Sequence, residues 1–297
     1  MTYPMRFTRR PARIGGLIAA LSLFAAGCAA PFDQEQTPED SEAAEIGNII
    51  DEANLNQLML TVSNPDDSVA YFKQASEKDP TRLDLKRGYG LALARARRYA
   101  DAVRVFEELA QVGGADDALR VEHAHALARL ERWQEAENQM ALVSTNLATP
   151  RRFAIDAMLA DQRADWAGAD AAYERARQLS ANPATIMNNW GVSRMSRGEY
   201  QLAQKTFEEA IAHNPRLFNI KNNLAVSRAL QGEYRLPLVS MTEEERATML
   251  HNIGVIALRR GDTDEAKGLF TMAVETHPRY YAAAAEKLAA LDGVVVN

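Results

Sequence analysis

Six polar side chains at matching places in three consecutive stretches of the chain are the residues best suited to binding a ligand. They are Asn188, Asn189, Asn222, Asn223, His251 and Asn252. An asparagine amide both donates and accepts hydrogen bonds, so a row of such amides can pair with the backbone of an extended peptide. We therefore expect these residues to line a surface that binds a peptide segment of a protein partner. The alternative is that they bond neighbouring helices to one another or cap them.

The residue types that usually carry catalysis or bind metals form no recognised pattern. His123 and His125 stand two apart, so on a helix they point to different sides and cannot chelate one ion together. His213 and His277 fall at the ends of expected helices, where a cation or polar cap is ordinary. No nucleotide-binding loop, zinc motif or nucleophile elbow is present. We expect no enzyme activity, metal, cofactor or small-molecule substrate; an enzyme with an unrecognised site is the alternative.

Composition and charge narrow the class of partner. The chain has 297 residues with 34 basic and 40 acidic side chains, a formal net charge of −6. Nucleic-acid binding through counterion release needs a basic surface, so we expect no nucleic-acid partner. A hydrophobic share of 47% and a charged share of 25% are typical of a globular protein. The single cysteine cannot form an internal disulfide.

One basic cluster departs from the acidic balance. Its members lie between positions 82 and 104, beside two acids, and are Arg82, Lys86, Arg87, Arg95, Arg97, Arg98 and Arg104. We interpret the cluster as the solvated surface of a helix pair. The alternative is a docking patch for an acidic partner segment.

Residues 1–27 have the layout of a secretory signal peptide. A basic start without acids precedes the apolar run 14–26, which is too short to span a bilayer comfortably. Small residues stand directly before Cys28, which resembles a bacterial lipoprotein signal. The resemblance implies that Cys28 is lipidated and anchors the chain in the outer membrane, facing the periplasm. Residues 28–45 then form a lipidated, acidic and flexible linker. The alternative is an ordinary signal peptide that is cleaved nearby.

The stretch 184–217 shows the spacing that organises the rest of the chain. Numbered from Ala184, it has Gly191 at position 8, Gly198 at 15, Tyr200 at 17 and Phe207 at 24. Small residues at position 8 let two helices approach closely, and a residue free to take positive φ ends the first helix. This spacing resembles the tetratricopeptide repeat, a helix–turn–helix unit of 34 residues. The resemblance implies an all-α fold, a right-handed superhelix of antiparallel helix pairs.

The same spacing recurs on both sides of that stretch. Position 20 is occupied by Ser68, Ala102, Ala136, Ala169, Ala203, Pro237 and Ala266. We expect about seven modules over 46–291, ending in a capping helix over 281–291, and a tail over 292–297. We expect the aromatic side chains at positions 17 and 24 to be core residues. In peptide-binding members of the family, polar residues of the first helices bond a peptide on the concave face, which is where the asparagine row would lie.

The sixth module, 218–246, is shortened. Pro237 stands at position 20 and cannot occupy the middle of a second helix. A capping box at Thr242–Glu245 then starts a new helix, which we expect to run from Glu243 to about Arg259. One interpretation is a tolerated deletion that changes the pitch. The other is that the apolar segment Leu236–Val239 packs across the stack or docks a partner.

The run Asn222–Phe270 resembles the TadD family of tight-adherence (Flp pilus) assembly lipoproteins. The resemblance implies a scaffold or pilotin that binds protein partners, among them the outer-membrane secretin and other pilus-assembly components. Another envelope machine, for outer-membrane protein assembly or peptidoglycan regulation, remains open as the alternative.

Overall fold

The computed structural model of the chain describes residues 54–293, and every regular element in this range is a helix. Residues 54–61 are helical. The helices that follow are α2 (Pro65–Lys78), α3 (Leu83–Arg95), α4 (Tyr99–Gln111), α5 (Asp117–Arg129), α6 (Trp133–Ala141), α7 (Pro150–Gln162), α8 (Trp166–Leu179), α9 (Ala184–Ser196), α10 (Tyr200–His213), α11 (Phe218–Ala229), α12 (Glu243–Arg260), α13 (Thr263–Thr276) and α14 (Ala282–Leu291).

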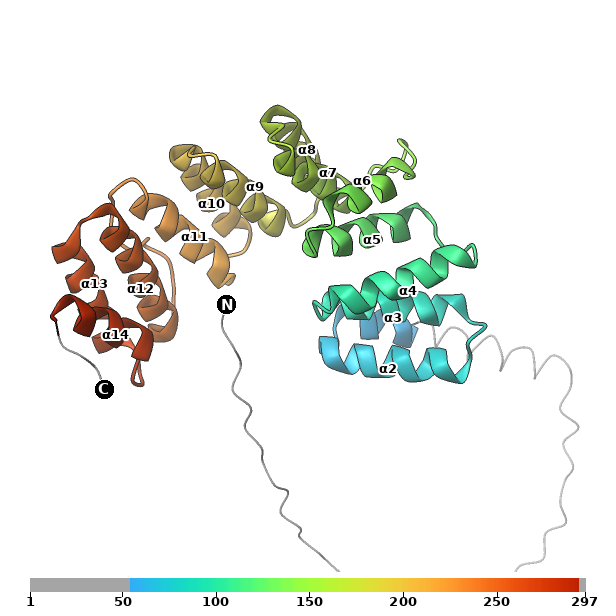
Figure 1. The fold of residues 1–297 in the computed structure, drawn as a ribbon, viewed down its shortest axis with the longest axis horizontal. Helices are drawn as coiled ribbons and strands as arrows, with labels where there is room; N and C mark the ends of the chain where they lie inside the picture. The colour runs from blue at the N-terminus through green and yellow to red at the C-terminus, as the bar shows by residue number, and fades with distance from the viewer. Residues whose placement is uncertain (1–53, 294–297) are drawn as a thin grey trace, which may run out of the picture. The chain divides into compact units, whose positions relative to one another are not determined.

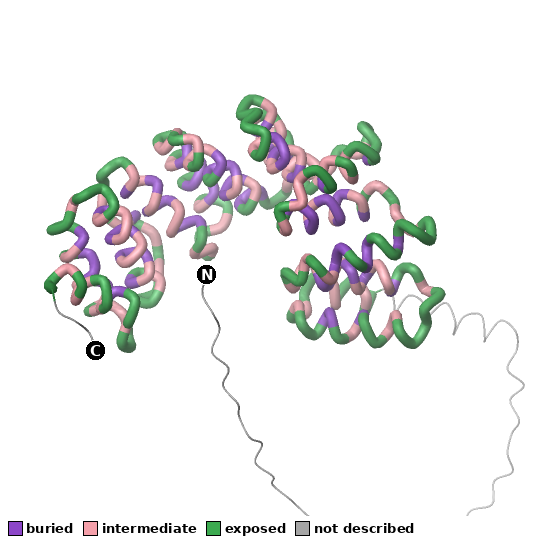
Figure 2. Tube along the Cα trace, in the orientation of Figure 1, coloured by how far each residue is buried: buried purple, intermediate pink, exposed green. Residues whose placement is uncertain are grey.

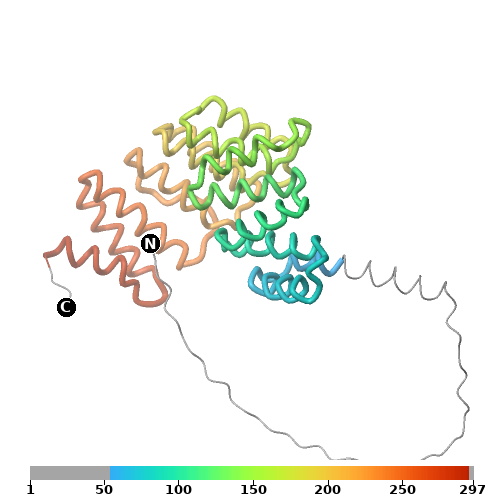
Figure 3. The backbone as a smooth tube through the Cα atoms, turned by 45° about the vertical axis from the view of Figure 1, so that its right-hand side comes forward, coloured from blue at the N-terminus to red at the C-terminus, as the bar shows by residue number. Residues whose placement is uncertain are grey.

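Consecutive helices run antiparallel and pack in pairs (Figures 1 and 3). The pairs α3–α4, α5–α6, α7–α8, α9–α10 and α12–α13 each make one module. The first four lie against one another in turn, and α11 packs between α10 and α12. The first helices of neighbouring modules also touch, as α3 touches α5 and α5 touches α7. The all-α stack that the 34-residue period predicts is therefore present. No helix within residues 54–293 is both long enough and apolar enough to cross a membrane.

A close approach between the two helices forms the core of several modules. Gly191 of α9 lies under the ring of Phe207 of α10, where an added Cβ would come within 2.5 Å of the ring. Gly254 and Phe270 repeat the arrangement between α12 and α13. Both rings are fully buried. Buried residues concentrate where helices face one another (Figure 2), so the glycine at position 8 sets the spacing of its helix pair.

The turn between the two helices of a module holds one residue in the left-handed region. Glycine fills it in the later modules and other residues fill it in the earlier ones: Gly198 (φ 84°), Gly232 (84°), Gly261 (89°), Arg97 (60°), Glu131 (60°) and Ala164 (56°). A residue with a Cβ is strained there by roughly 1 kcal/mol. The first half of the stack therefore closes its turns with more backbone strain than the second half.

Residues 230–242 replace the missing second helix of the sixth module with an irregular segment. Leu236 packs against the core around α12 and α13, and Pro237 is buried, whereas Leu238 is fully exposed. The first interpretation of this module, a deletion, fits the missing helix, and Leu236 packs on the stack as the second requires. Docking of a partner there stays a prediction.

A buried lysine holds this segment in place. Lys221 of α11 donates from Nζ to the backbone oxygen of Ser240 (2.9 Å) and to Glu245 Oε2 (2.7 Å). Glu245 also closes the capping box with Thr242, which confirms the helix start predicted there. One carboxylate thus serves the cap of α12 and the lysine of the preceding module.

Candidate functional site

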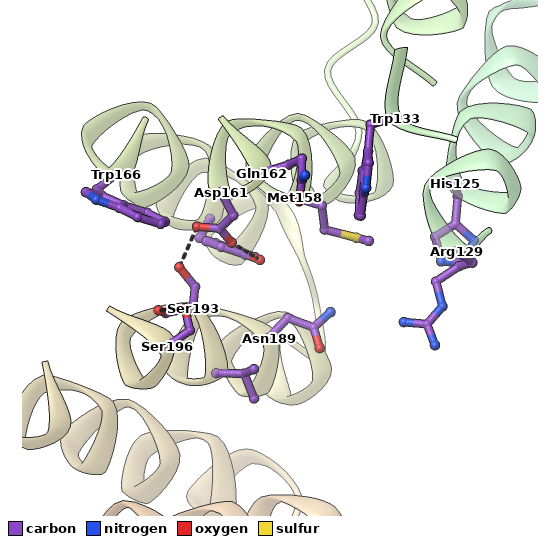
Figure 4. A pocket seen from close by; sticks show the side chains of 12 residues that line it. His125, Arg129, Trp133, Met158, Asp161, Gln162, Trp166, Asn189, Ser193 and Ser196 are labelled. Atoms are coloured by element: carbon purple, nitrogen blue, oxygen red, sulfur yellow. Dashed lines mark hydrogen bonds between the residues drawn. The ribbon is translucent and has the colours of Figure 1, made fainter. Parts of the chain in front are cut away.

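A cavity of about 380 Å³ opens on the face formed by the first helices α5, α7 and α9 (Figure 4). We call it the central pocket. The first residues of two second helices, Trp133 of α6 and Trp166 of α8, supply aromatic walls, and Met158 of α7 adds an apolar surface. Polar groups converge on the same space, among them Asp161 and Asn189. Large apolar walls with a few placed polar groups are typical of a binding site.

Asp161 of α7 is the carboxylate of the central pocket. It accepts hydrogen bonds from Ser193 Oγ of α9 (2.6 Å) and from the Tyr173 hydroxyl of α8 (3.0 Å), as Figure 4 shows. Burial raises the pKa of Asp161 above its ordinary value, while the two hydroxyl donors act in the opposite direction. Across residues 54–293 no ion pair within 4 Å joins this carboxylate to a cation, but Arg197, which pairs with Asp170, also lowers the pKa of Asp161 from a longer distance. Asp161 ties three helices together and keeps capacity to accept further bonds.

The α5 side of the central pocket carries a cation and a neutral ring. Arg129 lies over the ring of Tyr99, 5.6 Å from its centroid, and has no acidic partner within the described range. Burial, together with Arg151 and Arg129, lowers the pKa of His125 to about 3. The His125 Nδ1 atom accepts from Arg151 Nη2 at 2.7 Å, and Arg151 also pairs with Glu122. His125 is therefore an uncharged wall near neutral pH.

The prediction that aromatic residues at both repeat positions are core residues holds at position 24 and only in part at position 17, where Tyr99, Trp133 and Tyr234 are partly buried against the core. The position-24 rings of Phe106 and Phe207 are fully buried, as predicted. Trp166 at position 17 is 38% exposed, and with Trp133 it faces the central pocket. The physical reason is that position 17 opens the second helix, at the edge where two modules meet, rather than between the two helices of one module.

The structure bonds most of the predicted polar row from helix to helix. Asn223 Nδ2 of α11 donates to Asn188 Oδ1 of α9 at 3.0 Å. Asn252 Nδ2 of α12 donates to Asn222 Oδ1 of α11 at 2.7 Å. These are bonds of the kind that the alternative interpretation expects.

The two remaining members of the row differ from each other. The His251 ring packs against those of Phe270 and Tyr281, with centroids 5.7 and 5.5 Å away. Asn189 lines the central pocket. Binding of a peptide by the row stays a prediction, and Asn189 is the member best placed for it.

Neighbouring acids neutralise most of the basic cluster. Arg82 pairs with Asp84, Lys86 with Glu108, Arg87 with Asp116, and Arg98 and Arg104 share Asp101. Arg95 donates to the backbone oxygens of Met59 and Thr61. These pairs favour the interpretation as a solvated helix surface over a docking patch.

Several predictions fall outside the described residues. The signal peptide over 1–27, the lipidated Cys28, the linker over 28–45 and the first residues of the first module, 46–53, lie there, as does most of the tail. Within residues 54–293 no group of histidine, cysteine and acidic side chains could hold a metal ion.

Sequence reasoning missed the charged residues of the central pocket. Asp161 has no basic residue three or four places away in either direction, and Arg129 has no acidic one. Helical charges commonly pair at those spacings. A charge without such a partner is the one signal that could have singled them out.

Models of known protein families match the chain in three places. A tetratricopeptide repeat model matches residues 60–118 and 188–235, and a second tetratricopeptide repeat model matches residues 249–280. The chain is a stack of tetratricopeptide repeats. No curated protein sequence matches it significantly.

Solved tetratricopeptide structures share the fold at low identity. The human IFIT1 dimer with m7Gppp-AAAA is 14% identical, with a TM-score of 0.59, over 80% of this chain and 61% of that one. The Cut9 and Hcn1 hetero-tetramer of APC/C is 14% identical, with a TM-score of 0.52, over 77% of this chain and 46% of that one. This tetratricopeptide chain thus spans about half to three fifths of these relatives, and the likeness concerns the fold alone.

Tetratricopeptide proteins bind protein partners, and neither matching family model describes an enzyme. The stack is therefore suited to a protein-interaction scaffold. The central pocket is one place on it where aromatic, polar and charged side chains come together.

Proposed function

We propose that this chain is a non-enzymatic scaffold that captures an extended segment of a protein partner in the central pocket. The observation that carries the proposal is the convergence of three modules on one cavity. Trp133 and Trp166 offer apolar surface, Asn189 offers an amide that can pair with a peptide backbone, and Arg129 and Asp161 are charges without ionic partners in the described range. Groups without such partners contribute more binding free energy to a bound segment than groups whose partners are already in the stack.

We further propose that the scaffold works in the cell envelope, held at the outer membrane by a lipidated Cys28 and facing the periplasm. The support is the lipoprotein-like signal and the resemblance of Asn222–Phe270 to the TadD family. On this proposal the partners are the secretin and other components of Flp pilus assembly. Another envelope machine is the competing assignment.

Site-specific crosslinking tests both proposals. A photo-crosslinking residue replaces Gln162, an exposed residue that lines the central pocket, in the full chain in its native envelope. The matched control replaces Gln178, an exposed glutamine of α8 outside the pocket. We expect a discrete protein adduct from position 162 and none from 178.

The identity and the pattern of adducts decide the outcome. An adduct with the secretin supports the pilus assignment, and an adduct with unrelated envelope machinery refutes it while keeping the scaffold. Equal adducts from both positions, or none from either, contradict capture in the pocket. Release of a Cys28→Ser variant from the membrane fraction tests the anchor separately.

A substitution series separates Asn189 from the rest of the polar row. Asn189→Ala removes an amide from the pocket, and the bond that it loses is a long one of 3.5 Å to its neighbour Asn188 in the same helix. Asn223→Ala instead breaks the bond to Asn188. We expect the first change to weaken partner capture at unchanged thermal stability, and the second to lower stability. The reverse pattern would assign the row to structure alone.

A further inference from the structure

Asp161 differs from Asp170, another partly buried acid. Asp170 of α8 meets Arg197 at 2.6 Å, so its charge is balanced within the stack. Asp161 accepts from hydroxyl groups only, one bond on each oxygen. An ionised carboxylate offers about four acceptor sites, so Asp161 keeps two of them for a group that enters the pocket. Arg197 acts on its charge only from a distance, without forming an ion pair with it.

The walls beside Asp161 suit a cation with a long aliphatic stem. Trp133 and Met158 stand on one side of Asp161, and Trp166 stands on the other (Figure 4). Indole faces attract ammonium and guanidinium groups within about 6 Å, and they also cover the methylene groups of lysine and arginine. Two arginines of the stack lie nearby. Arg197 is over the ring of Trp166, 5.6 Å from its centroid, and pairs with Asp170. Arg129 lies across the pocket on α5 and rests on Tyr99.

We propose that the central pocket selects a lysine or arginine side chain of the bound segment, with Asp161 as its counter-ion and Trp133 and Trp166 as its walls. The charge complementarity rests on Asp161, which accepts from two hydroxyl groups and forms no ion pair within the described residues. The proposal rests on the proposed function, because it names the residue class that the scaffold recognises.

The arrangement also gives the bound segment a direction. The basic side chain lies at the α7–α9 side, near Asp161, and Arg129 at the α5 side favours an acidic side chain or a backbone carbonyl. A segment that carries a base and an acid at separate positions satisfies both charges in one orientation and neither in the other.

Selection from a displayed library of random 12-residue peptides tests the proposal on the full chain. We expect the peptides enriched on the unmodified protein to share one basic position. The Asp161→Asn variant should lose that preference, because it carries no charge; its amide oxygen still accepts from one hydroxyl, and its NH2 group can donate to the oxygen of the other. Asp156→Asn is the matched control: Asp156 is a half-buried acid on the same helix that pairs with Arg152 outside the pocket, and its loss should leave the preference intact.

A second measurement needs no altered protein. The chain has 3 tryptophans; two line the pocket, and Trp190 stacks on Tyr173 behind it. Intrinsic fluorescence therefore reports on this region. We expect an enriched peptide to bind about tenfold more weakly when its conserved lysine is replaced by norleucine, which keeps the stem and removes the charge.

The outcomes distinguish this proposal from the scaffold function beneath it. Enriched peptides without a shared basic position, or equal affinity for lysine and norleucine peptides, overturn the proposal and leave the scaffold intact. Enrichment that is the same on Asp161→Asn also overturns it. Failure to enrich any peptide counts against both.

Discussion

Changing glycine to alanine at two helical positions should have opposite effects on stability. Gly268 of α13 faces open space, with nothing within 4 Å of an added Cβ. Gly191 of α9 faces Phe207, whose ring atoms would lie 2.5, 2.7 and 2.8 Å from that carbon. Alanine is favoured over glycine inside a helix by about 1 kcal/mol. Gly268→Ala should therefore stabilise the stack by about that amount.

Gly191→Ala changes the free energy of unfolding by a second effect, a steric clash. The ring of Phe207 is fully buried and cannot retreat without displacing its neighbours. Overpacking of this kind costs roughly 2 kcal/mol. Set against the gain in helix propensity of about 1 kcal/mol, the substitution should destabilise the stack by about 1 kcal/mol. The two variants should then differ by roughly 2 kcal/mol with opposite signs.

Urea denaturation followed by circular dichroism measures this difference. The midpoint should rise for Gly268→Ala and fall for Gly191→Ala. A second change, Phe207→Leu, should relieve the clash, so the double variant should be more stable than the two single effects added together. If Gly191→Ala raises the midpoint as much as Gly268→Ala does, helix propensity alone governs the site and the close helix approach is not a constraint.

Three further predictions concern other parts of the stack. Ala164→Gly should raise stability by about 0.5 kcal/mol, because glycine takes the left-handed conformation without steric strain, at some cost in unfolded-state entropy. Gly198→Ala introduces that strain and should lower the urea midpoint. Burial, with a smaller effect of Arg132, lowers the pKa of His123 from 6.5 to about 4. The unfolded chain therefore binds a proton at higher pH than the folded one, and stability falls as the pH falls between these values. Melting temperatures should vary less with pH in this range for His123→Leu. Lys221→Met leaves Glu245 without its cation and should cost about 2 kcal/mol, with faster hydrogen exchange over residues 230–242; unchanged exchange there would show that the lysine does not hold the segment.

The parts of the fold that depend on local signals could be predicted from the sequence. The recurrence of small and aromatic residues placed the helix pairs, and the capping box at Thr242 placed the start of α12. Pro237 indicated that no second helix forms in the sixth module. Each signal acts through residues a few places apart, so the sequence contains the whole interaction.

The candidate site could be predicted only in part. Asn189 was singled out because it repeats in register with other asparagines. Asp161, Tyr173 and Ser193 lie on three helices, and their bonds span 12 and 32 residues along the chain. Tyr173 occupies repeat position 24, where periodicity predicts a core ring but not the hydroxyl bond to Asp161. Asp161 and Ser193 match none of the repeat positions used, so periodicity could not reveal them. The exposure of Trp166 at position 17 was not predicted, because the pattern fixes its spacing but not which surface it faces.

The bond between Lys221 and Glu245 has a consequence for how this chain can change length. A stack of repeats can gain length when a module is duplicated, provided that the residues at each new junction find matching neighbours. Lys221 in the sixth module requires a carboxylate at the start of the seventh. A change that separates these two modules, or that removes one of them, would leave the buried Lys221 without its carboxylate or Glu245 without its cation. Insertion of a duplicated module at this junction is therefore disfavoured.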